Sequence, residues 1–279
     1  MAFVFTSYWN FISRFADYEI PSGMQSLPNL YRDTAIWSVF FTIFMLAVPY
    51  AFKNLIFTKW FNSLDARKQV EFPPYFVSMF HHLTMVPIAW YYIYQDTLLE
   101  DYSHGTVDYS VFVGMVVPFC TGFIVGDTLC FAIFQALRGV PEYIIHHVLS
   151  LWMIFALLSA PGQLSRFFPH MLVCDTTNIF FNIAWLMRLA GYKGNAIVSF
   201  VEYMFALSFL LLRAVNLSIV MSIIFLSEPG QRMGISRFTL PPIVFLQWFW
   251  MQKIAWTALG LKKPAAKKHS DTGAVKKSS

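Results

Sequence analysis

The chain has 279 residues, of which 57% are hydrophobic and 13% are charged, and its formal net charge is +5. Because about a quarter of the residues in a soluble domain are charged, this composition excludes a soluble globular protein and predicts an all-α, polytopic membrane helical bundle. The basic excess suits an anionic membrane surface and argues against a nucleic-acid partner. Cys120, Cys130 and Cys174 have spacings that indicate neither a disulfide nor a zinc site.

The segment 1–33 is amphipathic rather than uniformly apolar. From Phe5 to Phe15, large apolar residues recur every three or four positions, and polar residues occupy the other side. This pattern predicts a short helix in the membrane interface, and a lumenal loop packed against the bundle explains it equally well.

Seven apolar runs of spanning length follow. A membrane span needs about 20 residues at about 1.5 Å rise per residue, so about seven transmembrane helices are predicted. They lie at roughly 34–57, 74–96, 109–137, 141–160, 163–189, 196–226 and 236–260. The run 141–160 is the least typical, because it contains Glu142 and two histidines, and without it the number of spans would be six.

The basic residues decide between six and seven spans. The loop 53–68 contains four Lys or Arg residues and the loop 188–193 contains two, whereas the loop 96–108 is acidic. With seven spans, both basic loops and the lysine-rich C-terminus share one side of the membrane, which the positive-inside rule makes cytosolic. With six spans they would not. We therefore expect seven spans and a cytosolic C-terminus.

The predicted organisation has four parts. They are a lumenal or interfacial segment (1–33), a first transmembrane helix with its basic loop (34–66), a six-helix core (67–260) and a disordered, lysine-rich cytosolic tail (261–279). The tail ends in KKSS, so Lys276 and Lys277 stand four and three places from the terminus. This spacing matches the dilysine retrieval signal of endoplasmic-reticulum membrane proteins. It predicts that location and, as a partner, the coat-protein retrieval machinery.

Polar residues recur inside the apolar runs. They are His81, His82, Asp127, His146, His147, His170, Asp175, Asn178, Asn182, Glu202, Arg213, Asn216 and Lys253. Ionisable side chains are costly in a bilayer and mark functional sites or paired charges. Asp175, Asn178 and Asn182 follow the spacing i, i+3, i+7, so they form one helical stripe that must face the interior of the bundle.

Helical spacing also constrains the other polar residues. Glu202 and Arg213 are eleven residues apart, so they share a face but stand about 16 Å apart along the axis. Each must therefore find a partner on another helix. Adjacent histidines differ by about 100° around a helix, so we expect one of each His-His pair to face inward and the other to lie at a flank.

Structural roles compete with functional ones for several of these residues. One structural role for Asn178 and Asn182 is hydrogen bonding between helices. For Arg213 and Lys253 the structural roles are those of counter-ions or interface anchors. Glu142 follows a proline at a helix start, where the helix dipole favours an acid. The histidines and buried aspartates together favour a functional site.

The chemistry of these residues points to acid–base catalysis. No HxxHH box is present, so a di-iron desaturase is excluded, and no histidine spacing supports haem or another metal. The third and seventh runs also lack the motifs of G-protein-coupled receptors. A histidine beside an aspartate can act as a general base near neutral pH, or the histidine can itself take an acyl group.

Four stretches in order carry a resemblance: FVSMFHH, GDTLCFAIF, PEYIIHHVLSL and CDTTNIFFNIAWLMRLAG. Over residues 67–260 the chain resembles the TLC-domain family. The resemblance implies a location in the endoplasmic reticulum or a related membrane and a role linked to lipids.

The resemblance is nearer to the TLC-domain proteins that are not ceramide synthases. Ceramide synthases carry a His-Asp-x-x-Asp segment, which falls here on Cys174 to Asn178. Asp175 matches its first aspartate, but Cys174 replaces the histidine and Asn178 replaces the second aspartate. Asp175 followed by two threonines and by Asn182 looks instead like the acidic segment of the non-synthase members.

We therefore expect a multi-pass protein of lipid metabolism or homeostasis with a cavity lined by His and Asp, and acyl transfer from acyl-CoA as its candidate reaction. The candidate catalytic residues are His146, His147, Asp175 and Asp127. The candidate substrate-binding residues are His81, Asn178, Asn182, Glu202 and Arg213. No metal or cofactor is expected apart from acyl-CoA as co-substrate, and membrane lipids are the expected partners. Homo-oligomerisation, sphingoid-base N-acyl transfer and a non-catalytic lipid-binding, trafficking or chaperone role stay open.

Overall fold

The computed structural model of the chain describes residues 27–98, 112–159, 167–192 and 194–259, and in this part every regular element is helical. In chain order the elements are α2 (Leu27–Asn54), α3 (Thr58–Ser63), α4 (Ala66–Leu98), η3 (Phe112–Val116), α6 (Val117–Asp127), η4 (Thr128–Ala132), α7 (Ile133–Leu137), α8 (Glu142–Ser159), α9 (Phe167–Leu172), η6 (Val173–Asp175), α10 (Thr176–Leu189), α11 (Ala196–Ser208), η7 (Phe209–Asn216), α12 (Leu217–Leu226), α13 (Glu228–Gln231), η8 (Gly234–Thr239) and α14 (Leu240–Ala258). The prediction of an all-α protein is confirmed.

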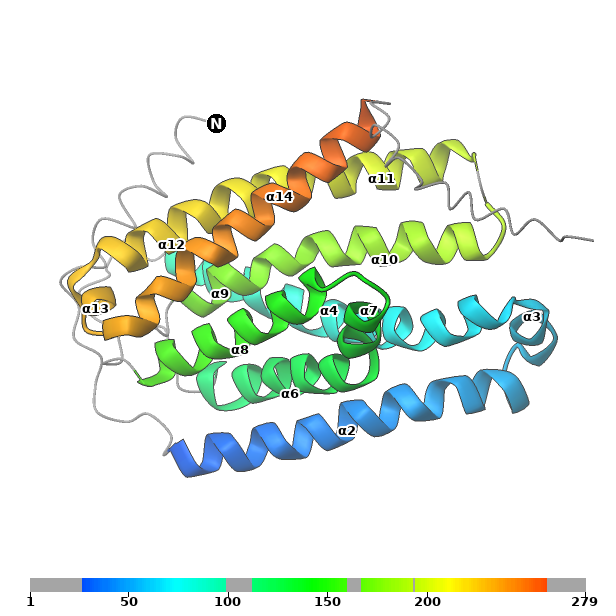
Figure 1. Ribbon diagram of the computed structural model, residues 1–279, viewed down its shortest axis with the longest axis horizontal. Helices are drawn as coiled ribbons and strands as arrows, with labels where there is room; N and C mark the ends of the chain where they lie inside the picture. The colour runs from blue at the N-terminus through cyan, green and yellow to red at the C-terminus, as the bar shows by residue number, and fades with distance from the viewer. Residues whose placement is uncertain (1–26, 99–111, 160–166, 193, 260–279) are drawn as a thin grey trace, which may run out of the picture.

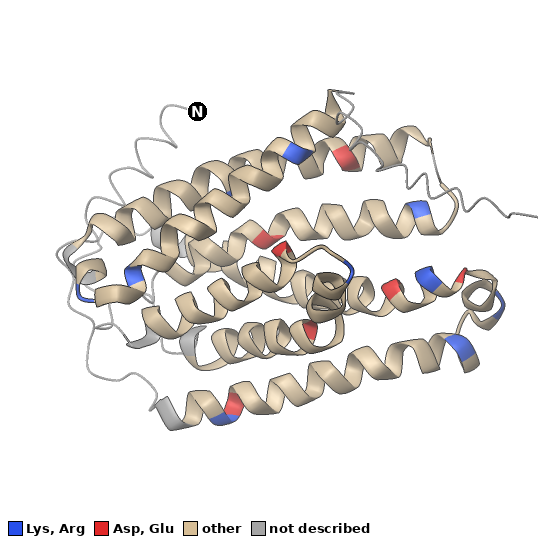
Figure 2. Cartoon of the chain, viewed as in Figure 1, with Lys and Arg blue, Asp and Glu red and all other residues tan. Residues whose placement is uncertain are grey.

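The long helices lie side by side along the long axis of the molecule and alternate in direction (Figure 1). As a result, the turn at α3, the turn between α10 and α11, and the end of α14 reach the same end of the bundle. Figure 2 shows Lys and Arg positions at this end, near α3 and at the end of α10. The arrangement agrees with the predicted grouping of the basic loops, and that this end is cytosolic stays a prediction.

Three helical stretches are long and apolar enough to cross a membrane. They are Asn29–Asn54, Gly114–Leu137 and Ala196–Leu226. On α2, the outward side chains of Ile36, Ile43 and Leu46 are each more than half exposed, as expected of a surface that faces lipid. Within the described residues, a helix also lies in each of the other predicted ranges, and α2 begins by Leu27 rather than at 34. The chain is a membrane-spanning helical protein, and the number seven stays a prediction.

Several predicted segments fall wholly or largely outside the described residues. They are the interfacial helix in 1–33, the acidic loop 96–108 and the tail 261–279 with Lys276 and Lys277. Their structures therefore stay predictions.

Local sequence explains where several helices begin and end. Asp65 precedes α4, and its carboxylate accepts a hydrogen bond from the backbone N–H of Lys68 at 2.9 Å. Asn195 caps α11 in the same way, accepting from the N–H of Ile197 at 2.8 Å. Gly191 follows α10 with φ of 97°, in the left-handed region that glycine adopts without steric strain. These residues fix turns at the basic end of the bundle.

Helix α2 packs against α6 through two glycines. A Cβ atom at Gly122 would lie 2.5 Å from the Cβ of Trp37, and one at Gly126 would lie 3.0 Å from the Cβ of Phe41. The two helix backbones therefore approach closely, which small residues four positions apart allow between membrane helices. Trp37 and Phe41 also pack edge-on against Phe119, with ring centroids 4.6 and 4.9 Å apart. This contact anchors α2 to the rest of the bundle.

Three helices depart from α-helical geometry next to predicted site residues. The π-helical turn η4 follows directly after Asp127, the 3-10 turn η6 ends at Asp175, and the π-helical stretch η7 contains Arg213. π-Helical turns are rare and often occur at functional sites. The pattern of apolar residues gives no sign of these departures, which coincide with the polar centre of the bundle.

Candidate functional site

A cavity of about 430 Å³ lies in the centre of the bundle. Helices α4, α6, α8, α10, α12 and α14 all contribute to its wall, which is mainly apolar. Every residue predicted to be catalytic or substrate-binding lines it, with the exception of Glu202. Its volume falls in the range of small-molecule pockets, about 300–1,000 Å³. The structure therefore brings predicted catalytic and substrate-binding residues of five separate runs to one place.

Both members of each His-His pair line this cavity. The expectation that one of each pair would lie at a flank is wrong. The cavity wall is broad enough to include side chains about 100° apart on one helix. His81 and His82 are accordingly both buried, at 2% and 3% exposure.

Glu202 lies away from the cavity. Its carboxylate pairs with the guanidinium of Arg188, and both side chains are exposed. The predicted common face of Glu202 and Arg213 assumed a regular α-helix. Because the π-helical stretch η7 begins at Phe209, between the two residues, the wider turns rotate Arg213 relative to Glu202. The expectation that each finds its partner on another helix is confirmed.

Asp175 is the centre of a largely buried ionic network, and its own side chain is 23% exposed. The Arg213 guanidinium donates to its Oδ1 atom at 2.8 Å and to the hydroxyl of Thr177 at 2.7 Å. The amide of Asn178 donates to the same Oδ1 atom at 3.1 Å. Arg213, which is 7% exposed, thus serves as a counter-ion, one of the two roles that the sequence left open.

The neighbours of His82 fix its tautomer. A carboxylate only accepts hydrogen bonds, so the Asn178 atom beside Asp175 must be the NH2 group. The same nitrogen lies 3.1 Å from Nε2 of His82, which therefore accepts. The proton of neutral His82 sits on Nδ1, which lies 3.3 Å from Nδ1 of His81 and 3.6 Å from Oδ2 of Asp175. His82 has no free ring nitrogen left for catalysis.

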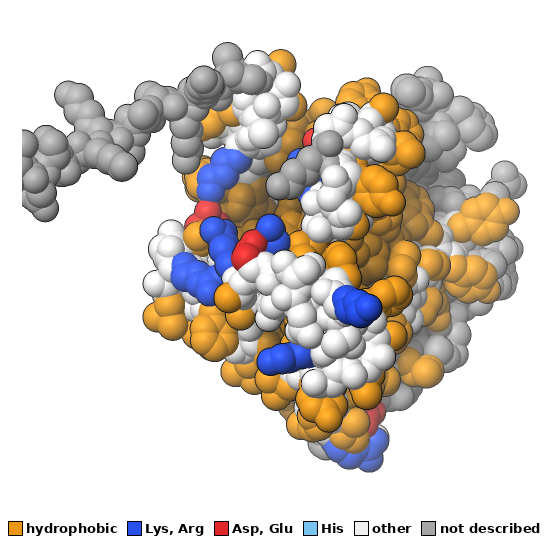
Figure 3. All heavy atoms as spheres, turned by 90° about the vertical axis from the view of Figure 1, so that its right-hand side faces the viewer, with side chains coloured by type: hydrophobic (Ala, Val, Ile, Leu, Met, Phe, Trp, Pro, Cys, Tyr) orange, Lys and Arg blue, Asp and Glu red, His pale blue; other side chains and the backbone are white. Residues whose placement is uncertain are grey.

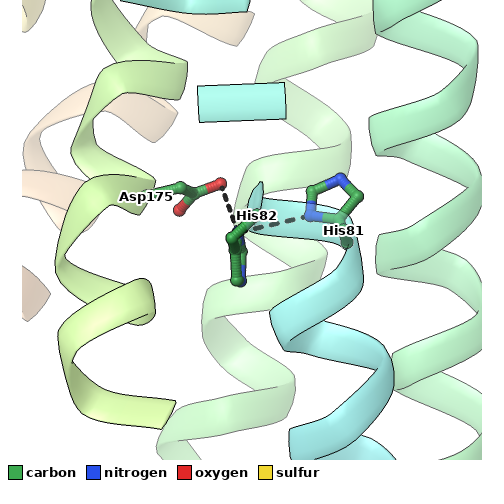
Figure 4. A group of neighbouring side chains, drawn as sticks. All are labelled: His81, His82 and Asp175. Atoms are coloured by element: carbon green, nitrogen blue, oxygen red, sulfur yellow. Dashed lines mark hydrogen bonds and ion pairs between the residues drawn. The ribbon is translucent and has the colours of Figure 1, made fainter. Parts of the chain in front are cut away.

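His81 is held as an acceptor for that proton. Its ring stacks on Phe123 with centroids 4.1 Å apart and an interplanar angle of 11°. Figure 4 shows the chain of contacts from Asp175 of η6 through His82 to His81 of α4. We interpret this group as a relay that orients the two imidazoles.

The same three residues also meet a distance criterion for a metal site. One ligand atom each from His81, His82 and Asp175 lies within 4.8 Å of the other two. Two neighbours oppose a cation there. The Arg213 guanidinium already neutralises Asp175, and the NH2 group of Asn178 requires an acceptor at Nε2 of His82, whereas a metal-bound histidine donates from its other nitrogen. The donors present favour the relay.

The second histidine–carboxylate pair is built differently. The Thr128 hydroxyl donates to the backbone oxygen of Ile124 at 2.6 Å, so it accepts from Nδ1 of His147, 3.0 Å away. The lone pair of neutral His147 is then on Nε2, which lies 3.5 Å from Oδ2 of Asp127. Two acceptors at this distance in a buried site repel each other unless one carries a proton. We interpret Asp127 and His147 as a pair that holds one proton between them.

His146 lies beside this pair. Its ring centroid is 5.8 Å from that of His147 and 5.3 Å from that of Trp250, and its buried Nδ1 atom has no hydrogen-bond partner among the described residues. One helical turn before His146 on α8, the carboxylate of Glu142 accepts a hydrogen bond from the ammonium group of Lys253 at 2.6 Å. His146 is therefore the cavity histidine whose Nδ1 is free to exchange a proton.

The asparagines connect helices. Besides the contact of Asn178 with His82, the amide of Asn182 donates to the Ser78 hydroxyl of α4 at 3.0 Å. Sequence reasoning assigned no role to Ser78 or Thr128. The sequence contained a signal for both. Ser78 stands three positions before His81, and Thr128 directly follows Asp127. The predicted stripe of Asp175, Asn178 and Asn182 faces the cavity.

Comparison with known proteins identifies the family. A model of the TLC domain matches residues 71–256. The chain belongs to the TLC-domain family. It is also similar to TLC domain-containing protein 4-B of Xenopus laevis, with 23% identity over 222 residues that cover 76% of this chain and 83% of the relative.

The cavity lies entirely within the TLC domain. The described residues that line it run from Pro74 to Ile254, inside the matched range 71–256. Helix α2 precedes the match and contributes nothing to the wall. The relative is named for the domain and not for a reaction. All described residues that line the cavity thus belong to the TLC domain. Helix α2 packs against α6 from outside the cavity.

Proposed function

We propose that this TLC-domain membrane protein is an enzyme of lipid metabolism that transfers an acyl group from acyl-CoA to a lipid acceptor in the cavity. The observation that carries the proposal is the contact of Asp127 with His147, 3.5 Å apart, next to His146 in a mainly apolar cavity. An acid and a base held side by side at one site are what acyl transfer requires.

The proposed reaction assigns each proton. His146 takes the proton of an amine or hydroxyl while that group attacks the thioester carbonyl, so that a C–N or C–O bond forms. The C–S bond breaks as the Asp127–His147 pair gives its proton to the leaving sulfur. His146 then returns its proton to the pair. Asp175, Arg213 and the His82–His81 relay act as positioning groups.

The charge distribution supports acyl-CoA as the donor. Lys and Arg side chains lie beside a hollow lined by hydrophobic side chains at the end of the bundle that carries α3 and the α10–α11 turn (Figure 3). Lys53 lies in the last turn of α2, Lys59 in α3, Arg67 at the start of α4 and Arg188 in the last turn of α10, all beside these turns. Basic side chains attract the phosphates of coenzyme A, and an acyl chain suits the apolar wall beyond them.

Purified protein in lipid nanodiscs tests this proposal. Long-chain acyl-CoA is supplied with a panel of acceptors: alkyl amines, a sphingoid base, alcohols and lysolipids. We expect an acylated product, and we expect Asp127→Asn and His147→Ala to lower the rate by a factor of about 10² or more with unchanged yield and thermal stability. Product from the sphingoid base alone would identify N-acyl transfer.

A non-catalytic lipid-binding or trafficking protein gives the opposite pattern. In that case no acceptor yields product, and Asp127→Asn and His147→Ala lower expression and melting temperature instead. Asp33→Asn is the matched control, because this carboxylate lies on α2, which contributes nothing to the cavity wall, and it should leave the rate unchanged.

We also propose that the protein resides in the endoplasmic-reticulum membrane with its C-terminus in the cytosol. The KKSS terminus supports this location, together with the grouping of the other basic segments at one end of the bundle. Changing Lys276 and Lys277 to Ser should move the protein to later compartments, as seen by fluorescence microscopy. An unchanged distribution would show that these lysines do not act as a retrieval signal.

A further inference from the structure

Helices α8 and α14 bring a second polar group to the cavity. The two helices run antiparallel: Glu142 pairs with Lys253, and one turn further His146 packs on Trp250. The same register, continued by one more turn, sets Ser150 opposite Gln247. Both of these residues line the cavity.

Gln247 is a buried amide without partners. The residue is 1% exposed, and neither its Oε1 nor its Nε2 atom has a hydrogen-bond partner among the described residues. Burial of an amide without hydrogen bonds is unfavourable, and most buried polar side chains are satisfied. Ser150 is 8% exposed, so a hydroxyl group stands across from the unpaired amide.

We propose that Gln247 and Ser150 form a binding subsite for a neutral lipid group that both donates and accepts hydrogen bonds, a hydroxyl or an amide. The carboxamide of Gln247 offers an acceptor and a donor side by side, and Ser150 offers either. No net charge is available to hold an ion, because the charged groups of these two helices that line or flank this part of the cavity, Glu142 and Lys253, pair with each other.

The position of the subsite also sets the distance between the two polar groups of a lipid that would bind. His146 and Ser150 are four residues apart on α8, on the same face and about 6 Å apart along the axis. A lipid whose reacting group lies at His146 would therefore place its second polar group one helical turn further in. This subsite rests on the proposed function only in that the cavity holds a lipid chain.

Three probes of equal chain length test the subsite: decane, 1-decanol and decanamide, added at equal mole fraction to the full-length protein in nanodiscs. Binding is followed by thermal unfolding through tryptophan fluorescence. We expect the alcohol and the amide to bind about fivefold more tightly than the alkane, or better, as one hydrogen bond provides. In Gln247→Leu all three should bind alike. The probe-free variant should melt at a higher temperature, because the unpaired amide is gone.

Gln252→Leu is the matched control, since this glutamine lies on the same helix but is exposed, and it should keep the preference. Ser150→Ala should reduce the preference and serves as the second variant if Gln247→Leu does not fold. The proposal is overturned if the wild type binds the three probes alike, or if both variants keep its preference. If no probe binds the wild type, the lipid cavity of the proposed function fails as well.

Discussion

The two histidine–carboxylate pairs of the cavity differ in what surrounds each imidazole. Asn178 occupies Nε2 of His82, whereas the acceptor hydroxyl of Thr128 leaves Nε2 of His147 facing Asp127. In the first pair, Asn178 and Arg213 donate to the available acceptor atoms, and the pair orients its neighbours. The second pair lacks a donor and must bind a proton. The proposed function therefore assigns positioning to the first pair and proton transfer to the second.

The ion pair of Asp175 with Arg213 leads to a prediction about stability. Removal of one partner leaves an uncompensated buried charge, which destabilises by about 3–5 kcal/mol. Asp175→Asn and Arg213→Met should each lower the free energy of unfolding by roughly this amount. The double variant should lose much less than the sum, because neither charge remains. Denaturant unfolding of the purified variants in detergent measures the three values, and additive losses would contradict the pairing.

At the scale of helices, the close contact of α2 with α6 depends on Gly122. A Cβ atom there would also lie 2.8 Å from the backbone nitrogen of Ser38, and backbone atoms cannot move aside as a flexible side chain can. Gly122→Ala should therefore lower stability by about 1–3 kcal/mol or more, measured as a fall in melting temperature.

Gly126→Ala provides the graded comparison. Its Cβ atom would meet Phe41 and the nitrogen of Thr42 at 3.0 and 3.3 Å, so a smaller fall is expected. Equal melting temperatures for the wild type and Gly122→Ala would show that α2 does not pack on α6 as described.

The sequence allowed the helical elements to be predicted, because apolar runs of membrane length need no tertiary information. It also allowed the stripe of Asp175, Asn178 and Asn182 to be placed on the interior face. The π-helical stretches were not predictable, since no residue pattern marks them, and η7 was enough to misplace Glu202. Both members of each His-His pair line the cavity because the cavity is broad, and its breadth depends on how the surrounding helices pack.

Hydrogen-bond partners were the least predictable part of the site. The contact of His147 with Thr128 spans 19 residues, and that of His82 with Asn178 spans 96. Periodicity within one helix carries no information on such contacts. Gln247 looked unremarkable in an apolar run, and only its burial without partners distinguishes it.

At the scale of the whole molecule, the bundle separates two environments. The outward faces of the helices are apolar and suited to lipid, the basic residues around α3 and at the end of α10 lie at one end, and polar groups of the TLC domain converge on an interior cavity. Histidine, carboxylate and amide side chains line this cavity. Under the function proposed above, a membrane lipid held in this cavity would react at these groups.

The most direct test of the central claim is a comparison of lipid composition in cells. Cells lacking the protein are supplied with the wild type or with Asp127→Asn, which keeps the size of the side chain but cannot share a proton with His147. At equal amounts of membrane-inserted protein, we predict that the wild type restores the altered lipid classes and Asp127→Asn does not. Restoration by Asp127→Asn to the wild-type level would contradict a proton-transferring role for the Asp127–His147 pair.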